Sequence, residues 1–546
     1  MRSGLRAAAF AGFALGAALL LHGPQRVAGA AAFPSDAGAI VHVLNRIGFG
    51  PRPGDVEKVR SLGLQSYIEQ QLRPDRISDA AVDARLRSFP TITMRSRDIA
   101  EQYELPVEQA RRARQQAGGQ NPGSPANPAN PVPPMLQQQA NRPMLELSEQ
   151  KILRAAYSER QLEEVLTDFW FNHFNVDSRK GVDRFMLTEY ERDVIRPHVL
   201  GKFRDLLGAT AKSPAMLFYL DNWQSVDPNG PHPDPQQARR GGFGGFGRRG
   251  FAFPPPPRQA APQAQNMKRG LNENYGRELM ELHTLGVDGG YTQQDVTEVA
   301  RAFTGWTIEQ PRQGGGFKFD PRLHDEGKKV VLGHTINAGG GERDGEEVLD
   351  LLARHPSTAR FIATKLVRRF VSDTPPPALV DRAAATFRST DGDLREVMRT
   401  ILTSPEFLAP DAYRAKTKTP FEFIVSTVRA TGADVQDALP LVRQLQQLGM
   451  PLYQCQPPTG YKDTADAWVN TGALVSRMNV AVQLASGRLP GTMVGAQLLE
   501  NATPAGTIAA ILNGEVSDAT RTTIARATQP SQMIALTLGS PEFQRR

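Results

Sequence analysis

Apolar residues recur at helical spacing over most of the chain. Within residues 359–370 they fall at positions i, i+3, i+4, i+7 and i+11, which places them on one face of an α-helix. The other side of this helix carries Lys365, Arg368 and Arg369. We expect these cations to form a solvated face, with contact to an anionic polymer as the alternative.

Residues 291–296 have the pattern of a helix start. Thr292 can cap the first turn, Asp295 can complete a capping box with it, and Tyr291 can pack on Val296. We therefore predict a helix that begins here and ends near Gly305.

A short internal repeat marks two helix ends. Residues 401–407 read ILTSPEF, and residues 537–543 read TLGSPEF. Because proline disfavours helical backbone at the residue before it, both helices should end at the serine, Ser404 or Ser540.

Strand signals are scarce. Phe317–Phe319 and Lys329–Leu332 flank the turn residues 324–327, and together they predict one small β-hairpin. The predicted fold is mainly α: a large multi-helix globular domain with a small β-hairpin element and two long disordered loops.

The two loops are expected at residues 114–141 and 227–266, where proline, glycine, glutamine and asparagine replace large apolar residues. Length alone, 546 residues, would allow three or four domains of about 150 residues. We instead predict a single helical domain over residues 33–546, interrupted by these loops. Residues 242–247 match the dinucleotide-binding pattern, but no strand precedes them and no helix follows, so a flexible spacer is favoured.

The N-terminus has the pattern of a signal peptide. Arg2 and Arg6 precede an apolar run of small residues over 7–21, and alanine-rich sites follow at 28–32. The run is shorter than the roughly 20 residues that cross a bilayer. We expect residues 1–32 to direct export, with cleavage near Ala30 or Ala32 and a periplasmic or secreted product without a membrane span. An uncleaved anchor is the alternative.

The net charge of +7 is misleading as a sign of nucleic-acid binding. Three arginines lie in residues 1–32 without an acid, and residues 227–266 hold five arginines against two aspartates. These two segments account for six of the seven charges, so the rest of the chain lacks a surplus for phosphate contacts. We expect no nucleic-acid partner. Cys455 is the only cysteine, which excludes an intramolecular disulfide.

Residues 272–286, NENYGRELMELHTLG, form the densest group of candidate catalytic side chains. At 100° per residue, one polar arc of this helix holds Glu273, Asn274, Arg277, Glu278 and Glu281, and an apolar arc holds Tyr275, Leu279, Met280, Leu282 and His283. Carboxylates this close need an arginine, a metal or a proton when they are buried, as in an acid/base pair. The alternative is a solvated face with a Glu273–Arg277 ion pair.

Three histidines are candidate ligands. His173 and His283 lie among apolar residues, where core histidines also lie, whereas His324 and Asp325 occupy a polar turn from which both can point outward. Together with Glu278, these four would suit a divalent metal if they converged. No Walker loop, serine elbow or zinc-binding helix motif is present.

Several motifs together resemble one family. They are HVLNR at 42–46, WFNHF at 170–174, residues 272–292, ARAFTGW at 300–306 and the His324–Asp325 turn. This combination resembles a large bacterial family called domain of unknown function 1800, over nearly the whole chain. The resemblance implies an exported, mainly helical protein and a co-encoded exported partner with a sulfatase-like fold, and it implies no particular activity.

Two positions depart from the family pattern. The family usually has alanine at Gly276 and tends to have Gly-Trp at Gly460-Tyr461. Glycine in a helix should lower helix stability by up to about 1 kcal/mol.

Two functions are expected from the sequence. The first is a metal-assisted hydrolase acting on an extracellular polymer or ester, with Glu278 or Glu281 as the base beside Arg277, and with His324 and Asp325 binding metal or substrate. The second is a non-catalytic export or assembly factor that binds a partner protein.

Overall fold

Helices follow one another along almost the whole described chain, as the apolar spacing predicts. The computed structural model describes residues 36–118, 133–230, 270–500 and 502–546. All of these belong to one compact unit that spans residues 35–546. The predicted signal peptide, the pattern at 242–247 and the middle of both predicted loops lie outside the described residues.

The helices before residue 230 include the one that supplies a wall of the site described below. They are α1 (Ala37–Ile47), α2 (Asp55–Leu62), α3 (Leu64–Gln71), α4 (Ala80–Leu86), α5 (Ser96–Ile99), α6 (Leu105–Gly118), α7 (Pro134–Tyr157), α8 (Gln161–His173), α9 (Leu187–Glu189), α10 (Phe203–Lys212) and α11 (Pro214–Tyr219).

The helices after residue 270 supply the other walls. They are α13 (Glu273–Glu278), α14 (Gln293–Ala302), α15 (Glu342–Arg354), α16 (Pro356–Phe370), α17 (Pro377–Ser389), α18 (Leu394–Leu402), α19 (Pro420–Ala430), α20 (Leu439–Gln447), α21 (Thr471–Ala485), α22 (Ala496–Glu500), α23 (Pro504–Leu512), α24 (Asp518–Ala525) and α25 (Pro530–Gly539). Among the described residues, no helix is both long enough and apolar enough to cross a bilayer.

The strands form three short antiparallel pairs within the described residues: β1 (Trp306–Ile308) with β2 (Phe317–Phe319), β3 (Lys329–Val331) with β4 (His334–Ile336), and β5 (Asp434–Val435) with β6 (Thr492–Met493). The predicted strands at 317–319 and 329–332 exist, but their predicted pairing is wrong. Each strand has a nearer partner across a shorter turn: Phe319 pairs with Trp306, and Val331 pairs with His334.

The predicted loop at 114–141 is helical at both ends. Helix α6 continues to Gly118, and α7 begins at Pro134 with its proline in the first turn. Glutamine and alanine are good helix formers, so a composition poor in large apolar residues did not prevent helix here.

The helix ends follow the local sequence. Thr292 accepts a hydrogen bond from the Asp295 N–H while the Asp295 carboxylate accepts one from the Thr292 N–H, so the predicted capping box starts α14. Helices α18 and α25 end before their Ser-Pro pairs. In both repeats the serine hydroxyl accepts a hydrogen bond from the phenylalanine N–H three residues later.

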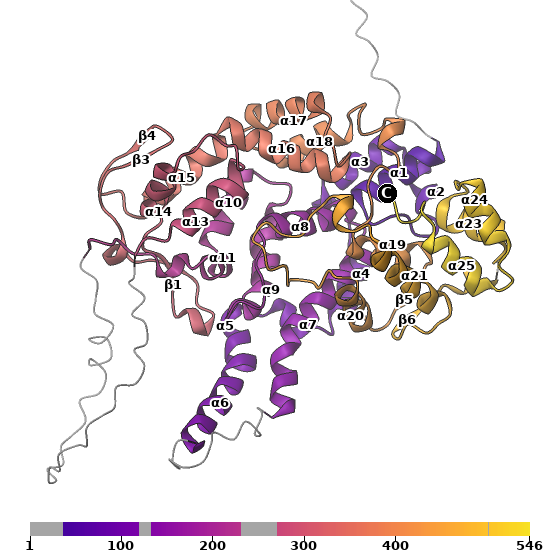
Figure 1. The fold of residues 1–546 in the computed structure, drawn as a ribbon, viewed down its shortest axis with the longest axis horizontal. Coiled ribbons are helices and arrows are strands. Elements are labelled where there is room, and N and C mark those ends of the chain that lie inside the picture. Colours follow the sequence, from indigo (N-terminus) through magenta and orange to yellow (C-terminus); the bar gives the residue numbers. More distant parts are fainter. Residues whose placement is uncertain (1–35, 119–132, 231–269, 501) are drawn as a thin grey trace, which may run out of the picture. The chain divides into compact units, whose positions relative to one another are not determined.

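Helix α16 is buried on more than its apolar stripe. Ala359, Ile362, Ala363, Leu366 and Phe370 are inaccessible to solvent, as the spacing predicts. Figure 1 shows α16 beside α17 and α18, and α16 also contacts α15. The prediction of a solvated cationic side is wrong for the last turns, because elements far away in the sequence cover them.

Helix α13 packs closely on α14 through Gly276. A Cβ at this position would lie 2.8 Å from the carbonyl oxygen of Val296 and 3.2 Å from the amide nitrogen of Ala300. The glycine therefore allows the two helix backbones to approach each other, which offsets its low helix propensity.

Candidate functional site

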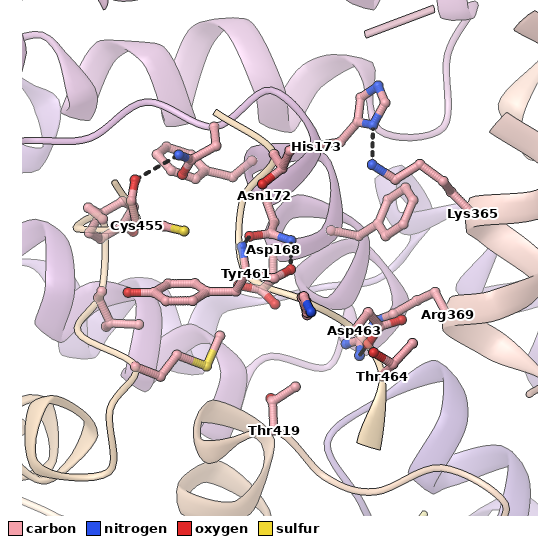
Figure 2. A pocket seen from close by; sticks show the side chains of 18 of the residues that line it. Asp168, Asn172, His173, Lys365, Arg369, Thr419, Cys455, Tyr461, Asp463 and Thr464 are labelled. Atoms are coloured by element: carbon pink, nitrogen blue, oxygen red, sulfur yellow. Dashed lines mark hydrogen bonds and ion pairs between the residues drawn. The ribbon is translucent and has the colours of Figure 1, made fainter. Parts of the chain in front are cut away.

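A cavity of about 260 Å³ lies where α8, α16 and the segment 450–464 meet. We call it the His173 cavity. Helix α8 supplies Asp168, Asn172 and His173, and α16 supplies Lys365, Arg368 and Arg369. Figure 2 shows His173 and Lys365 pointing toward each other across the cavity wall.

Two asparagines at the end of α8 hold the segment 450–464 in place. The Asn172 amide group donates to the Tyr461 carbonyl oxygen at 2.8 Å and accepts from the Tyr461 N–H at 2.7 Å. Asn175 donates to the carbonyl oxygens of Cys455 and Pro457. The paired hydrogen bonds between Asn172 and Tyr461 resemble those between two β-strands. Together with the Asn175 contacts they hold the segment 450–464 in place, although its backbone is irregular.

Gly460 makes the contact with Asn172 possible. Its φ is +72°, and a Cβ there would lie 2.2 Å from the Asn172 carbonyl oxygen. We expect Gly460→Ala to lower the free energy of unfolding by about 2 kcal/mol or more, because strain and a backbone clash add. Gly449→Ala is the matched control, since its φ is +82° and nothing lies within 4 Å of its Cβ position. If urea denaturation shows the same loss of unfolding free energy for both variants, the close approach of Gly460 to Asn172 is contradicted.

His173 is held as a neutral imidazole. Its Nε2 lies 3.1 Å from the His283 carbonyl oxygen and acts as the donor there, which leaves Nδ1 as the acceptor for the Lys365 ammonium at 2.8 Å. Burial, the Lys365 charge and His283 hold the pKa of His173 well below its usual range. His173 therefore positions the Lys365 amine without sharing its charge.

Lys365 is a partly buried cation without a carboxylate partner among the described residues. Burial lowers the pKa of Lys365 to about 8; Asp463 raises it and Arg368 lowers it further. The Arg368 guanidinium also has no hydrogen bond or ion pair within the described chain, and its Nε is buried without a partner. Two cationic groups thus line the cavity with unused hydrogen-bond donors.

The other cations of the cavity are paired. Lys151 lies 2.8 Å from Asp168. Arg369 lies 2.5 Å from Glu422 and 3.3 Å from Asp463, and Lys462 lies 3.9 Å from Asp466. Among the described residues of the lining, Asp168 and Asp463 are the only acids, so Lys365 and Arg368 are a local surplus of positive charge.

Part of the predicted acidic arc contacts α14, and none of its residues lines the His173 cavity. Gln293 bridges Glu273 and Arg277, in place of the direct pair considered from sequence. Glu281 accepts a hydrogen bond from the Tyr291 hydroxyl at 3.0 Å. Burial and the neighbouring Glu281 raise the pKa of Glu278. The helix also widens into a π-helical turn over Leu279–Thr284, which changes the assumed 100° spacing beyond Glu278.

The outward orientation predicted for His324 and Asp325 is wrong. The His324 side chain is fully buried, with Nδ1 2.8 Å from the Thr304 carbonyl oxygen and Nε2 3.3 Å from Asp344. Asp325 pairs with Arg301 at 2.7 Å. The buried Lys329 reaches Asp344 at 2.7 Å. These contacts join the β3–β4 hairpin to α14 and α15, which indicates a structural role.

The structure brings together some of the predicted metal ligands. The ring centroids of His173 and His283 lie 6.2 Å apart, while His324 and Asp325 belong to the separate Arg301–Lys329–Asp344 cluster. In the part of the chain that the structure describes, no group of three or more His, Cys, Asp or Glu residues is arranged to hold a metal ion. Cys455 is buried in the His173 cavity, and burial raises the pKa of its thiol to about 11.

Lys365, Arg368 and Arg369 were missed as site residues because they were expected to face solvent. One signal was present: α16 carries four cations, Arg360 and these three, and no acid. A solvated basic face usually alternates with acids that pair along the helix.

Fold and site together define a mainly helical protein with a cation-rich cavity. The sequence profile of the family described as "Protein of unknown function (DUF1800)" matches residues 42–545, a span that includes every element of the His173 cavity. The chain belongs to this family. No curated protein and no solved structure matches the chain.

Proposed function

We propose that the protein binds an anionic group in the His173 cavity and hydrolyses an ester or polymer that carries it. One observation carries the proposal: the Lys365 amine is held by a neutral imidazole, and no carboxylate neutralises it within the described residues. The partly buried Lys365 ammonium and the neighbouring Arg368 gain charge-assisted hydrogen bonds when an anion enters.

The same amine can supply the proton transfers of ester hydrolysis. A pKa of about 8 allows Lys365 to give up and regain a proton near neutral pH, and the bound anion favours the ammonium form that a general acid needs. In the proposed step the water oxygen bonds to the acyl carbon, the bond from that carbon to the leaving oxygen breaks, and the ammonium gives its proton to that oxygen. The amine that remains then takes up the proton that the attacking water loses. Arg368 stabilises the negative charge that develops.

A panel of p-nitrophenyl esters tests the activity. We expect the purified protein to hydrolyse a monoester with a terminal carboxylate, such as the adipate or suberate, faster than the neutral acetate once the rate without protein is subtracted. Lys365→Met should lower this rate by about 100-fold, the smaller end of a general acid–base contribution. Lys318→Met, at an exposed lysine of β2, is the control. No hydrolysis of any ester, or equal rates for Lys365→Met, would refute the catalytic part.

We also propose that residues 1–32 direct export to the periplasm or the medium. The support is the charged start, the short apolar run and the small residues at 28–32. N-terminal sequencing of the protein recovered from the periplasm and medium should give a start near Ala30 or Ala32. An intact N-terminus in the cytoplasm would contradict export.

Partner binding is a second candidate function, and the surface of α21 favours it. Leu474, Val475 and Val482 are exposed on this helix, and Val469 is exposed just before it. The proposed occupant is the co-encoded exported protein with a sulfatase-like fold. Co-purification should be lost in Val475→Asp and kept in Lys365→Met. Co-purification that Val475→Asp leaves intact would exclude this surface.

A further inference from the structure

A second cavity, of about 200 Å³, lies between α1, α19 and the segment after α25. We call it the Lys418 cavity. Asn45 comes from α1, Ser426 from α19, and Arg545 from the segment after α25. None of the residues that line it belongs to the His173 cavity.

Lys418 lines this cavity as a buried side chain without a polar partner. The residue is 4% exposed, and within the described residues its Nζ makes no hydrogen bond or ion pair. The Nζ lies 3.8 Å above the centre of the Phe543 ring. The backbone holds it there, because its N–H donates to Gln544 and its carbonyl oxygen accepts from Arg477.

The charged groups that act on Lys418 are mostly positive. Burial lowers the pKa of Lys418 to about 7; Glu422 raises it, and Arg546, Arg414 and Arg477 lower it further. A cation in this position is stabilised when an anion takes the space beside it.

Ser426 adds a second unused group. It is 2% exposed, and its hydroxyl makes no hydrogen bond within the described part of the chain. A Cβ on Gly50 would meet Ser426 Oγ at 3.5 Å and Asn45 Oδ1 at 3.1 Å, so both side chains reach this end of the cavity. A hydroxyl can donate to an oxyanion that Lys418 also binds.

The acids in the lining do not satisfy Lys418. Glu542 accepts hydrogen bonds from the Ser517 N–H and the Thr520 hydroxyl at the start of α24. Glu57 is exposed and lies 3.8 Å from Arg60. Arg545 is exposed and has no ion pair in the described structure, which adds positive charge to the lining.

We propose that the Lys418 cavity is a second binding site, separate from the His173 cavity, that takes a small oxyanion such as a carboxylate or phosphate group. The Lys418 ammonium and the Ser426 hydroxyl bind its oxygens, and Arg545 attracts it from the surface. The volume limits the ligand to a small molecule or to the end group of a larger one.

Residue-resolved labelling tests the site in the wild-type protein. Lysines are methylated with formaldehyde and cyanoborohydride, with and without inorganic phosphate or acetate, and the rates are read by peptide mass spectrometry. An anion at ten times its dissociation constant should slow labelling of Lys418 about 11-fold by mass action and leave Lys318 unchanged. Protection by phosphate alone assigns a phosphate site, and protection by acetate assigns a carboxylate site.

Two variants separate this site from the His173 cavity. Protection of Lys418 should persist in Lys365→Met and weaken in Ser426→Ala, which removes one hydroxyl and keeps the lysine. Labelling of Lys418 that neither anion slows would overturn the proposal, as would protection that disappears in Lys365→Met.

Discussion

Glu422→Gln is expected to lower the free energy of unfolding by about 3–5 kcal/mol, the cost of breaking a buried ion pair. Glu422 is buried, and its Oε1 lies 2.5 Å from Arg369 and 3.0 Å from Arg546. Its Oε2 accepts the Thr419 N–H at the start of α19. In the variant, the neutral glutamine amide would leave the buried Arg369 and Arg546 guanidinium groups without the carboxylate that both contact in the wild-type protein.

The same pair makes stability depend on pH. Burial alone would raise the pKa of Glu422, but Arg369 and Arg546 lower it to about 2, below its unfolded value of 4.5. The stabilisation is therefore complete above pH 4.5 and is lost as the pH falls toward 2. Urea denaturation at pH 7 and at lower pH should show this loss in the wild-type protein and a smaller one in Glu422→Gln.

Glu57→Gln is the control for this prediction, because the Glu57 side chain is 70% exposed. It should change the free energy of unfolding by no more than about 0.5 kcal/mol. A Glu422→Gln protein as stable as Glu57→Gln would show that the buried charges find other partners.

Lys365→Met is expected to weaken anion binding in the His173 cavity by about 10- to 100-fold. Hydrogen bonds to charged groups contribute about 1.5–3 kcal/mol, and each 1.4 kcal/mol is a factor of ten in affinity. Methionine keeps the length of the side chain and removes its charge. Calorimetric titration with sulfate or acetate at pH 7 measures the effect, because most of the Lys365 ammonium is present below its pKa of about 8.

The titration should be repeated with Lys418→Met, so that anion binding in the Lys418 cavity can be distinguished from binding in the His173 cavity. Lys318→Met is the surface control. An affinity that Lys365→Met leaves unchanged while Lys418→Met abolishes it would place the anion in the Lys418 cavity alone. The proposed function would then fail, and the second site would stand.

Local sequence signals predicted the local structure well. The capping box at Thr292, the helix ends before Pro405 and Pro541, and the apolar stripe of α16 all depend on residues within a few positions of one another. Strand pairing was predicted wrongly because two competing partners, Trp306–Ile308 and His334–Ile336, carry weaker strand signals than the runs they pair with.

The site could not be predicted because it depends on contacts across the chain. His173 meets Lys365, 192 residues away, and Asn172 meets Tyr461, 289 residues away. Periodicity identifies the face of α16 that is apolar, but it cannot show that Lys365 and Arg369 on its other side are covered. The pattern Thr419-x-x-Glu422 marks a helix start, yet only the packing of Arg369 and Arg546 makes Glu422 a buried anion.

Proton uptake on anion binding tests the central claim most directly. Sulfate binding is followed by calorimetry at pH 8 in two buffers of different ionisation enthalpy. An anion beside Lys365 should raise its pKa, so the protein should take up about half a proton per sulfate bound at that site. In a Lys418→Met background, which removes the lysine of the second cavity, this uptake should persist, and it should disappear when Lys365→Met is added. Binding without uptake, or uptake that Lys365→Met does not change, would contradict the claim that Lys365 is the unpaired cation of an anion-binding cavity.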